Sequence, residues 1–190
     1  MPTLDRPAAQ RLNDDQLTTR KSDRSANAGE EKKETPVDTT IFHELRQREG
    51  LVRVVTDHVK LETPGNAHIA RITDQVSDVL RRTELTDGTL TVFAPGATGA
   101  VTTVEFEPGV VADMQELFDT IVPPEKHYEH NVNLGDGNGH SHVRAGLLGP
   151  SLTVPFADGV MTLGRYQEIV FVDFDARPRS RSVVVQIMGV

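Results

Sequence analysis

The stretch EIVFVDF, residues 168–174, has the length of a β-strand and is apolar on both of its faces. In an extended chain Ile169 and Phe171 point to one side, while Val170 and Val172 point to the other. A strand with two apolar faces is typical of the centre of a sheet that is covered on both sides. We therefore expect this strand in the middle of the core. Because one domain of this size has limited material for covering both faces, we also expect another subunit to pack against the sheet.

Further strands are predicted on either side of this stretch, where β-branched and apolar runs are bounded by turn-forming residues. These runs cover residues 51–61, 90–93, 100–106, 152–156, 160–163 and 182–188. Ala157-Asp158-Gly159 and Ala176-Arg177-Pro178 have the composition of hairpin turns between the last strands. The run 182–188 is rich in valine, so we expect it to be as buried as EIVFVDF.

Two amphipathic helices are predicted between the strands. The first follows Thr73 and has one apolar face, which consists of Ile72, Val76, Val79 and Leu80. The second follows Pro108-Gly109 and has an apolar stripe, which consists of Val110, Met114, Leu117, Phe118 and Ile121. A shorter helix is expected at residues 143–148. This order of elements predicts an α+β fold with a largely antiparallel or mixed sheet and two main helices on it.

The composition excludes several classes of protein. The formal charge of −8 argues against a protein that coats nucleic acid, which requires a basic face. The chain has no cysteine, so a metal would have to bind to His, Asp, Glu or carbonyl oxygen. No apolar run is long enough for a transmembrane helix, and the first residues lack the apolar core of a secretory signal. We therefore expect a cytoplasmic protein that does not bind membranes.

The chain divides into a tail and one domain. Residues 1–40 are polar and charged and have no apolar periodicity, so we expect a disordered N-terminal tail. The whole chain is 37% apolar, which suits a globular protein, and residues 41–190 have the length of a single domain.

Four of the seven histidines lie within residues 127–142, on either side of a segment rich in glycine. His140 and His142 are two residues apart, so on an extended chain their rings would share one side and could bind one ion. On a helix they would point about 200° apart and could not. His130 is the candidate for a third ligand, since three imidazoles and a water form an open zinc site. The alternative is that these histidines only hydrogen-bond to the backbone, as we expect of the surface residue His127.

The second candidate site is the arginine-rich turn at residues 173–181. On a strand, the side chains of Arg177, Arg179 and Arg181 would point to one side, and Arg144 could join them. Guanidinium groups bind phosphate or carboxylate. The alternative is a solvated turn in which Asp175 pairs with an arginine.

The third candidate is the segment of small residues at 96–105. Successive backbone N–H groups in such a segment can form an anion-binding nest, although a glycine-rich turn is usually only a turn. Glu105 at its end is a candidate general base or metal ligand.

The order of several motifs resembles the YjbQ family, also called secondary thiamine-phosphate synthase. The matching segments are Ile72-Thr73-Asp74, Thr102 to Glu105 with Asp113, Tyr128 to Asn131, Asp136 to His142, Gly159 with Leu163 to Gln167, and Asp175 with Arg177 to Arg181. The family's His-Thr-Thr-Ala is replaced here by Gly96-Ala97-Thr98-Gly99-Ala100, so the family histidine near position 96 is absent. The segment resembles a subgroup of the family that has Ser-Thr-Gly-Ala at this place.

The resemblance implies a compact α+β subunit in a homotrimer, with sites near the subunit boundaries. It also implies a transferase that joins a pyrimidine diphosphate to a thiazole phosphate with a divalent metal, Zn²⁺ or Mg²⁺. The site residues then fall into three groups. The metal ligands would be His130, His140 and His142; the residues that bind a small phosphorylated or anionic ligand would be Arg144, Arg179 and Arg181; the catalytic residues would be Glu105, Asn138 and Gln167. The alternative is a non-catalytic trimeric module that binds a metal or a metabolite.

Overall fold

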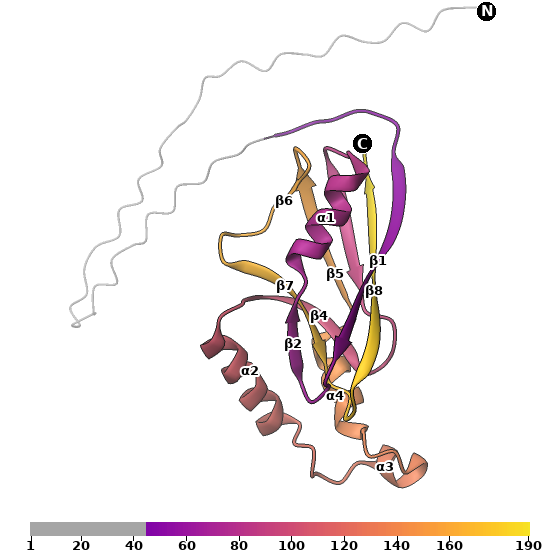
Figure 1. The fold of residues 1–190 in the computed structure, drawn as a ribbon, viewed down its shortest axis with the longest axis vertical. Helices are drawn as coiled ribbons and strands as arrows, with labels where there is room; N and C mark the ends of the chain where they lie inside the picture. The colour runs from indigo at the N-terminus through magenta and orange to yellow at the C-terminus, as the bar shows by residue number, and fades with distance from the viewer. Residues whose placement is uncertain (1–44) are drawn as a thin grey trace, which may run out of the picture. The chain divides into compact units, whose positions relative to one another are not determined.

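The computed structural model describes residues 45–190, and Figure 1 shows the arrangement of their helices and strands. The predicted tail at 1–40 and the expected start of the domain at 41–44 lie outside the described residues. The elements in order are β1 (Arg53–Thr63), β2 (His68–Arg71), α1 (Thr73–Thr83), β3 (Gly88–Phe93), β4 (Gly99–Glu105), α2 (Pro108–Ile121), α3 (Glu129–Leu134), α4 (Gly139–Leu148), β5 (Ser151–Ala157), β6 (Val160–Met161), β7 (Gln167–Asp173) and β8 (Arg179–Gly189). None of the helices in this part of the chain combines the length and the apolar content needed to cross a membrane.

The strands form two antiparallel sheets. The first has the order β1-β8-β3-β5-β6 and the second has the order β2-β7-β4. The predicted α+β fold with antiparallel sheets is therefore confirmed. The expected hairpin at Ala157-Asp158-Gly159 joins β5 to β6, but the expected hairpin at residues 176–178 is wrong, because it joins β7 to β8 in the other sheet.

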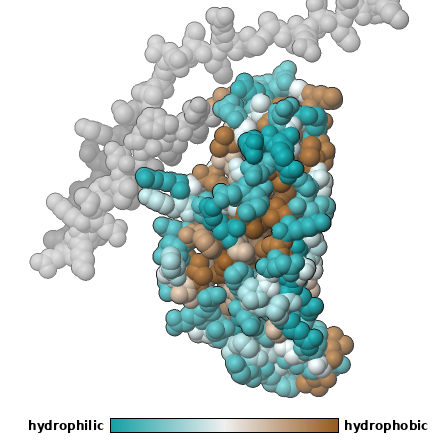
Figure 2. Space-filling view, in the orientation of Figure 1, coloured by the Kyte–Doolittle hydropathy of each residue, from teal (hydrophilic) through white to brown (hydrophobic). Residues whose placement is uncertain are grey.

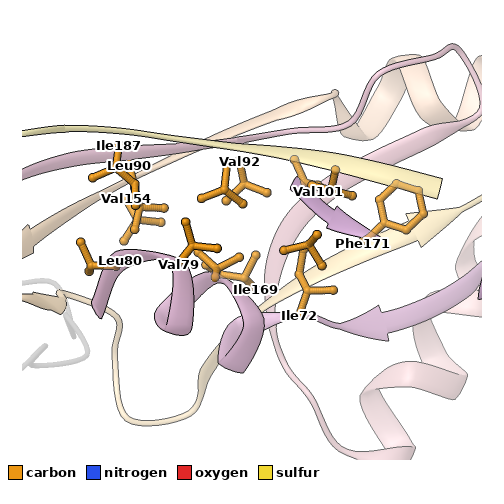
Figure 3. Packing of buried hydrophobic residues seen from close by; sticks show 14 of the residues in the cluster. Ile72, Val79, Leu80, Leu90, Val92, Val101, Val154, Ile169, Phe171 and Ile187 are labelled. Atoms are coloured by element: carbon orange, nitrogen blue, oxygen red, sulfur yellow. The ribbon is translucent and has the colours of Figure 1, made fainter. Parts of the chain in front are cut away.

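The strand β7 lies between two separate groups of apolar side chains. Ile169 and Phe171 pack with α1, β3, β5 and β8 in the larger group, which Figure 3 shows from close by. Val170 and Val172 pack in the smaller group with Phe118 of α2 and neighbours that include Ala145 of α4. The central, two-sided burial predicted for EIVFVDF is confirmed. The reason that we gave for expecting a second subunit over this strand is not confirmed, because elements of this chain cover both faces of β7.

The two predicted main helices differ in how much they bury. In α1 the predicted apolar positions Val76, Val79 and Leu80 are all buried. In α2 only Phe118 is buried, whereas Leu117 and Ile121 are more than half exposed. The strand β8 is likewise buried on one face only, since Gln186 and Met188 are exposed. These faces were expected to be buried, and within the described residues they are open.

The two sheets are joined at a bend in which two turns lie side by side. One turn connects β1 to β2, and the other connects β7 to β8, so that Thr63 pairs with Arg179 before the bend and His68 pairs with Asp173 after it. Gly65 lies in the first turn with a φ of +80°, and a Cβ there would be 2.3 Å from the backbone oxygen of Asp175. Only glycine fits this approach, which brings the polar ends of four strands together.

Replacing Phe171 by alanine tests the two-sided core. Phe171 is 2% exposed, so Phe171→Ala should lower the free energy of unfolding by about 3–5 kcal/mol, measured by urea denaturation. The matched control is Phe93→Ala at the end of β3, where the ring is 41% exposed and the loss should be about 1 kcal/mol or less. Equal losses in the two variants would contradict the assignment of β7 to the centre of the core.

Candidate functional site

The histidine-rich segment forms two short helices joined by a glycine turn. Residues 139–148 are the helix α4, which begins four residues before the helix that we predicted at 143. The extended path that binding of one ion by both His140 and His142 would require is therefore not the one that the structure has. The turn starts at Gly135, which ends α3 with a φ of +71°.

The helix α3 is held against α4 by polar contacts. None of its residues is buried, and Val132 and Leu134 are 64% and 69% exposed. Figure 2 shows apolar surface at this end of the molecule, where Figure 1 labels α3. Asn131 Oδ1 accepts a hydrogen bond of 2.8 Å from the backbone N–H of Gly139. This bond closes the turn and brings His130 of α3 next to α4.

His130, Asp136 and His142 bring their potential ligand atoms within 4.8 Å of one another, and we call these three residues the His-Asp-His cluster. The imidazole rings of His130 and His142 lie 4.5 Å apart between centroids. His130 Nε2 is 3.1 Å from Asp136 Oδ1. In a tetrahedral zinc site with bonds of about 2.0–2.1 Å, neighbouring ligand atoms lie roughly 3.4 Å apart. The distance between His130 Nε2 and Asp136 Oδ1 is close to this value, and the Nε2 or Nδ1 atom of His142 lies within 4.8 Å of both residues.

The ring of His142 is oriented by a backbone carbonyl. Its Nδ1 lies 2.9 Å from the oxygen of Ala97, in the segment before β4. Because a carbonyl only accepts, Nδ1 must carry the proton in this bond, which leaves the lone pair of the neutral ring on Nε2. A histidine that binds a metal through one ring nitrogen usually donates the N–H of its other ring nitrogen to a carbonyl or carboxylate oxygen.

Asn138 lies at the centre of the cluster. The hydrogen-bond network assigns its side-chain nitrogen to the inner position, where the nitrogen is 3.0 Å from His130 Nε2, 3.0 Å from Asp136 Oδ1 and 3.2 Å from His142 Nε2. Acceptor atoms from three residues thus converge on one hydrogen-bond donor. Such convergence of lone pairs is also what a cation requires.

The structure does not include His140 in this cluster. His140 and His142 are two residues apart on α4, so their side chains point about 200° from each other. His140 is buried, and its Nδ1 has no hydrogen-bond partner among residues 45–190. Burial lowers the pKa of His140, and the charge of Arg144 lowers it further, so the ring is neutral at neutral pH. His127 is exposed beside Glu129, as we expected of a surface residue.

Arg144 is a structural residue in this chain. Its side chain is 2% exposed, and it donates to the carbonyl oxygen of Val122 at 2.7 and 2.9 Å and to Asp119 at 2.8 Å. These bonds tie α4 to the end of α2. We had expected Arg144 to bind an anionic ligand, but its guanidinium group is already engaged by Val122 and Asp119 and is not presented to one.

Arg179 and Arg181 are engaged by two buried carboxylates at the bend between the sheets. Arg181 donates two hydrogen bonds of 2.6 Å to Asp173, which is fully buried. Arg179 donates to Asp175 at 2.9 Å, and Thr98 donates to the same carboxylate at 3.2 Å. The alternative of an Asp175–Arg pair is thus what the structure has, although the pair is buried on the Asp175 side. We call Asp173, Asp175, Arg179 and Arg181 the bend network.

Glu105 and Gln167 lie at the opposite end of β4 from the His-Asp-His cluster. They pair with each other across β4 and β7, and Gln167 hydrogen-bonds to Thr103 and to the backbone of Gly164. The strand spans six residue steps from Gly99, which corresponds to about 20 Å. Among the three residues that we predicted to be catalytic, only Asn138 lies beside the histidines.

Asp136 and Ala97 are the site residues that we did not single out. Asp136 belongs to the same glycine turn as Asn138, and a carboxylate between two histidines on one short segment was the available signal. The carbonyl oxygen of Ala97 carries no signal in the sequence, because every residue has one.

The bend network predicts that acid weakens the fold through Asp175. Burial alone would raise the pKa of Asp175, but hydrogen bonds from Arg179 and Thr98 and the charge of Arg179 outweigh it and lower the pKa. The stabilisation of the fold by the Asp175 carboxylate is therefore complete above the pKa of aspartate in the unfolded chain, about 3.9. It is lost as the pH falls through the lower pKa of Asp175 in the folded state. The difference in unfolding free energy between wild type and Asp175→Asn should be largest near neutral pH and should narrow at about pH 3. Urea denaturation across this range measures it, and a constant difference would contradict the prediction.

Comparison with known proteins relates most of this chain to one family. A UPF0047 protein of Methanothermobacter thermautotrophicus is 36% identical over 138 residues, which are 73% of this chain and 94% of that protein. YugU of Bacillus subtilis, also a UPF0047 protein, is 30% identical over 132 residues, which are 69% of this chain and 97% of that protein.

The fold comparison agrees with the sequence comparison. The crystal structure of a YbjQ-like protein of unknown function from Sulfolobus solfataricus P2 matches with a TM-score of 0.70 and 27% identity, over 74% of this chain and 100% of that one. A structure from Clostridium acetobutylicum, an uncharacterised member of the yjbq/upf0047 family, matches with a TM-score of 0.64 and 31% identity, over 69% of this chain and 98% of that one. The profile of UPF0047 YjbQ-like proteins covers residues 57–190. The chain therefore belongs to the YjbQ-like UPF0047 family.

Proposed function

We propose that this protein binds a divalent metal at the His-Asp-His cluster and that this metal is the centre of its activity. The observation that carries the proposal is the convergence of acceptor atoms from His130, Asp136 and His142 around one point. The fixed tautomer of His142 supports it, because the lone pair of Nε2 is already directed to the same point. A cation at that point displaces the amide nitrogen of Asn138.

The ligand set favours zinc over magnesium. Two imidazole nitrogens and one carboxylate suit Zn²⁺, whereas Mg²⁺ prefers oxygen ligands in an octahedral arrangement. Three protein ligands leave a position open, and the side chains of His130 and Asp136 are 32% and 39% exposed, so a small molecule can reach the cluster. A zinc ion at such an open site polarises a bound substrate oxygen or acidifies bound water.

The reaction that the family resemblance suggests is a transfer on a small phosphorylated substrate, of the thiamine-phosphate synthase type. Loss of pyrophosphate requires positive charge near the leaving group. In this chain the metal would supply most of that charge, because Arg144 and Arg181 are engaged by protein carbonyl and carboxylate groups. We therefore propose that any such activity depends strictly on the metal.

A second candidate function is a non-catalytic module that binds a metal or a metabolite in a homotrimer. The observation that favours it is the position of Glu105 and Gln167, which lie at the far end of β4 from the cluster. Among residues 45–190 the cluster then has Asp136 as its only carboxylate, and this residue would be occupied as a ligand. A metal without an independent general base fits a structural role as well as a catalytic one.

Loss of a cluster residue should remove the metal. Protein purified without a histidine tag should contain close to one zinc per chain, measured by elemental analysis. His130→Ala and Asp136→Ala should lower the zinc affinity by more than the roughly 10–100-fold that loss of an outer partner costs. Competition with a chromophoric chelator measures the affinity.

The chain offers two histidine controls for this experiment. His127→Ala removes an exposed imidazole from the same segment, and His140→Ala removes one that points away from the cluster; both variants should keep the metal. An absence of zinc binding in the wild type, or equal loss in His127→Ala and His130→Ala, would overturn the proposal.

Rescue of a thiamine auxotroph separates the two candidate functions. If the protein is an enzyme of the thiamine-phosphate synthase type, the wild type should restore growth and Asp136→Ala should not, because the transfer depends on the metal. If it is a non-catalytic module, neither should restore growth, and metal removal should instead dissociate or melt the protein. Sedimentation and thermal melting with and without a chelator measure these effects.

A further inference from the structure

We propose that Thr98 is a positioning residue of the metal site, through which the bend network sets the orientation of His142. This inference rests on the proposed metal site. It gives the arginines of the bend network a role other than the binding of an anion. Thr98 has a buried side chain and lies next to Ala97, the residue whose carbonyl oxygen accepts the proton of His142.

Thr98 is held by hydrogen bonds on both its side chain and its backbone. Its Oγ1 accepts a bond of 2.9 Å from Arg181 and donates one of 3.2 Å to Asp175. Its carbonyl oxygen accepts a bond of 2.8 Å from the N–H of Phe174. A guanidinium group only donates and a carboxylate only accepts, so the hydroxyl group has one satisfying orientation.

The partners of Thr98 are themselves fixed. Arg181 is bound to Asp173 through two hydrogen bonds, and Asp173 also accepts the hydroxyl proton of Thr63 on β1. Charge-assisted pairs of this kind, buried from water, hold their geometry more firmly than neutral surface contacts. The hydroxyl of Thr98 is thus anchored to the point where both sheets meet.

The segment that carries Ala97 needs such an anchor. Gly96 and Gly99 flank Ala97 and Thr98, and Gly96 has a φ of +108° in a region with open space around its Cα. Gly96 leaves the backbone before Ala97 free to take several paths, whereas Gly99 already belongs to β4 and packs against Phe171. Because Thr98 is tied to the bend network, the adjacent peptide carbonyl of Ala97 is held 2.9 Å from His142 Nδ1. A contiguous path of bonds therefore runs from Arg181 and Asp175 to the metal ligand.

The path explains why arginines lie near a metal site without contacting it. They do not present charge to a ligand, since carboxylates already engage them. They hold the segment that selects the neutral tautomer of His142 with its lone pair on Nε2. Without that selection, part of the population would carry the proton on Nε2 and could not bind a metal.

The test compares Thr98→Val with Thr98→Ser in the full-length protein. Valine keeps the shape of threonine and removes the hydroxyl group, whereas serine keeps the hydroxyl group. Thr98→Val should lower the zinc affinity by about 10–100-fold, as loss of an outer partner does, and Thr98→Ser should stay near the wild type. In the metal-free protein, the ring ¹⁵N chemical shifts of His142 in Thr98→Val should move toward a mixture of tautomers.

The matched control is Thr83→Val, which removes a buried threonine hydroxyl group that bonds to Leu80 and Leu85 and not to the bend network. Thr83 is the last residue of α1 and lies outside the path from the bend network to Ala97, so this variant should lose stability without a change in the ¹⁵N shifts or the zinc affinity. If Thr98→Val does not fold, Thr98→Ala takes its place in both measurements.

Three outcomes would overturn the inference. They are unchanged zinc affinity and ¹⁵N shifts in the folded Thr98 variant, the same changes in Thr83→Val, and a failure of Thr98→Ser to keep the wild-type values. The ¹⁵N shifts are measured without metal, so they test the positioning role even if the wild type binds no zinc. Absence of zinc binding in the wild type would instead defeat the proposed function.

Discussion

The pairing of Asp173 with Arg181 is the interaction on which both the fold and the candidate site depend. Asp173 is the last residue of β7 and is fully buried, so its charge requires a partner. Arg181 of β8 supplies it across the bend between the two sheets. Removing one member of such a pair leaves an uncompensated buried charge, which typically costs about 3–5 kcal/mol. The pair therefore fixes how the chain passes from β7 in one sheet to β8 in the other.

The same strand divides its residues between two tasks. Its middle is apolar on alternating sides and separates the two groups of core side chains, with Ile169 and Phe171 on one side and Val170 and Val172 on the other. Its end is polar and forms the bend network. The apolar part stabilises the domain, and the polar part orders the segment before β4 that reaches the histidines. The strand β7 thus contributes both to the core and to the order of the segment beside the candidate site.

The His-Asp-His cluster differs from the site that the family resemblance suggested. Asp136 takes the place that we had given to His140, because α4 turns His140 toward the interior. The arginines expected to bind an anion are bound to protein groups instead. One relative is described as a UPF0047 protein and another as a YbjQ-like protein of unknown function. The donor set of the cluster is therefore the most specific chemical indication that this chain offers.

Local patterns in the sequence determined the elements whose shape follows from periodicity, and tertiary structure decided the rest. The two apolar faces of EIVFVDF and the apolar face of α1 were predicted correctly, because burial imposes a period of 2 or 3.6 on the residues themselves. The path of residues 131–141 was not, since His140 and His142 fit a strand or a helix equally well until α4 packs against the core. The sequence offered a pair of Asp175 with an arginine as an alternative, but the bonds between Asp173 and Arg181 and the burial of both carboxylates were beyond it. They depend on the pairing of Thr63 with Arg179 across more than a hundred residues, and no local pattern encodes such a distance.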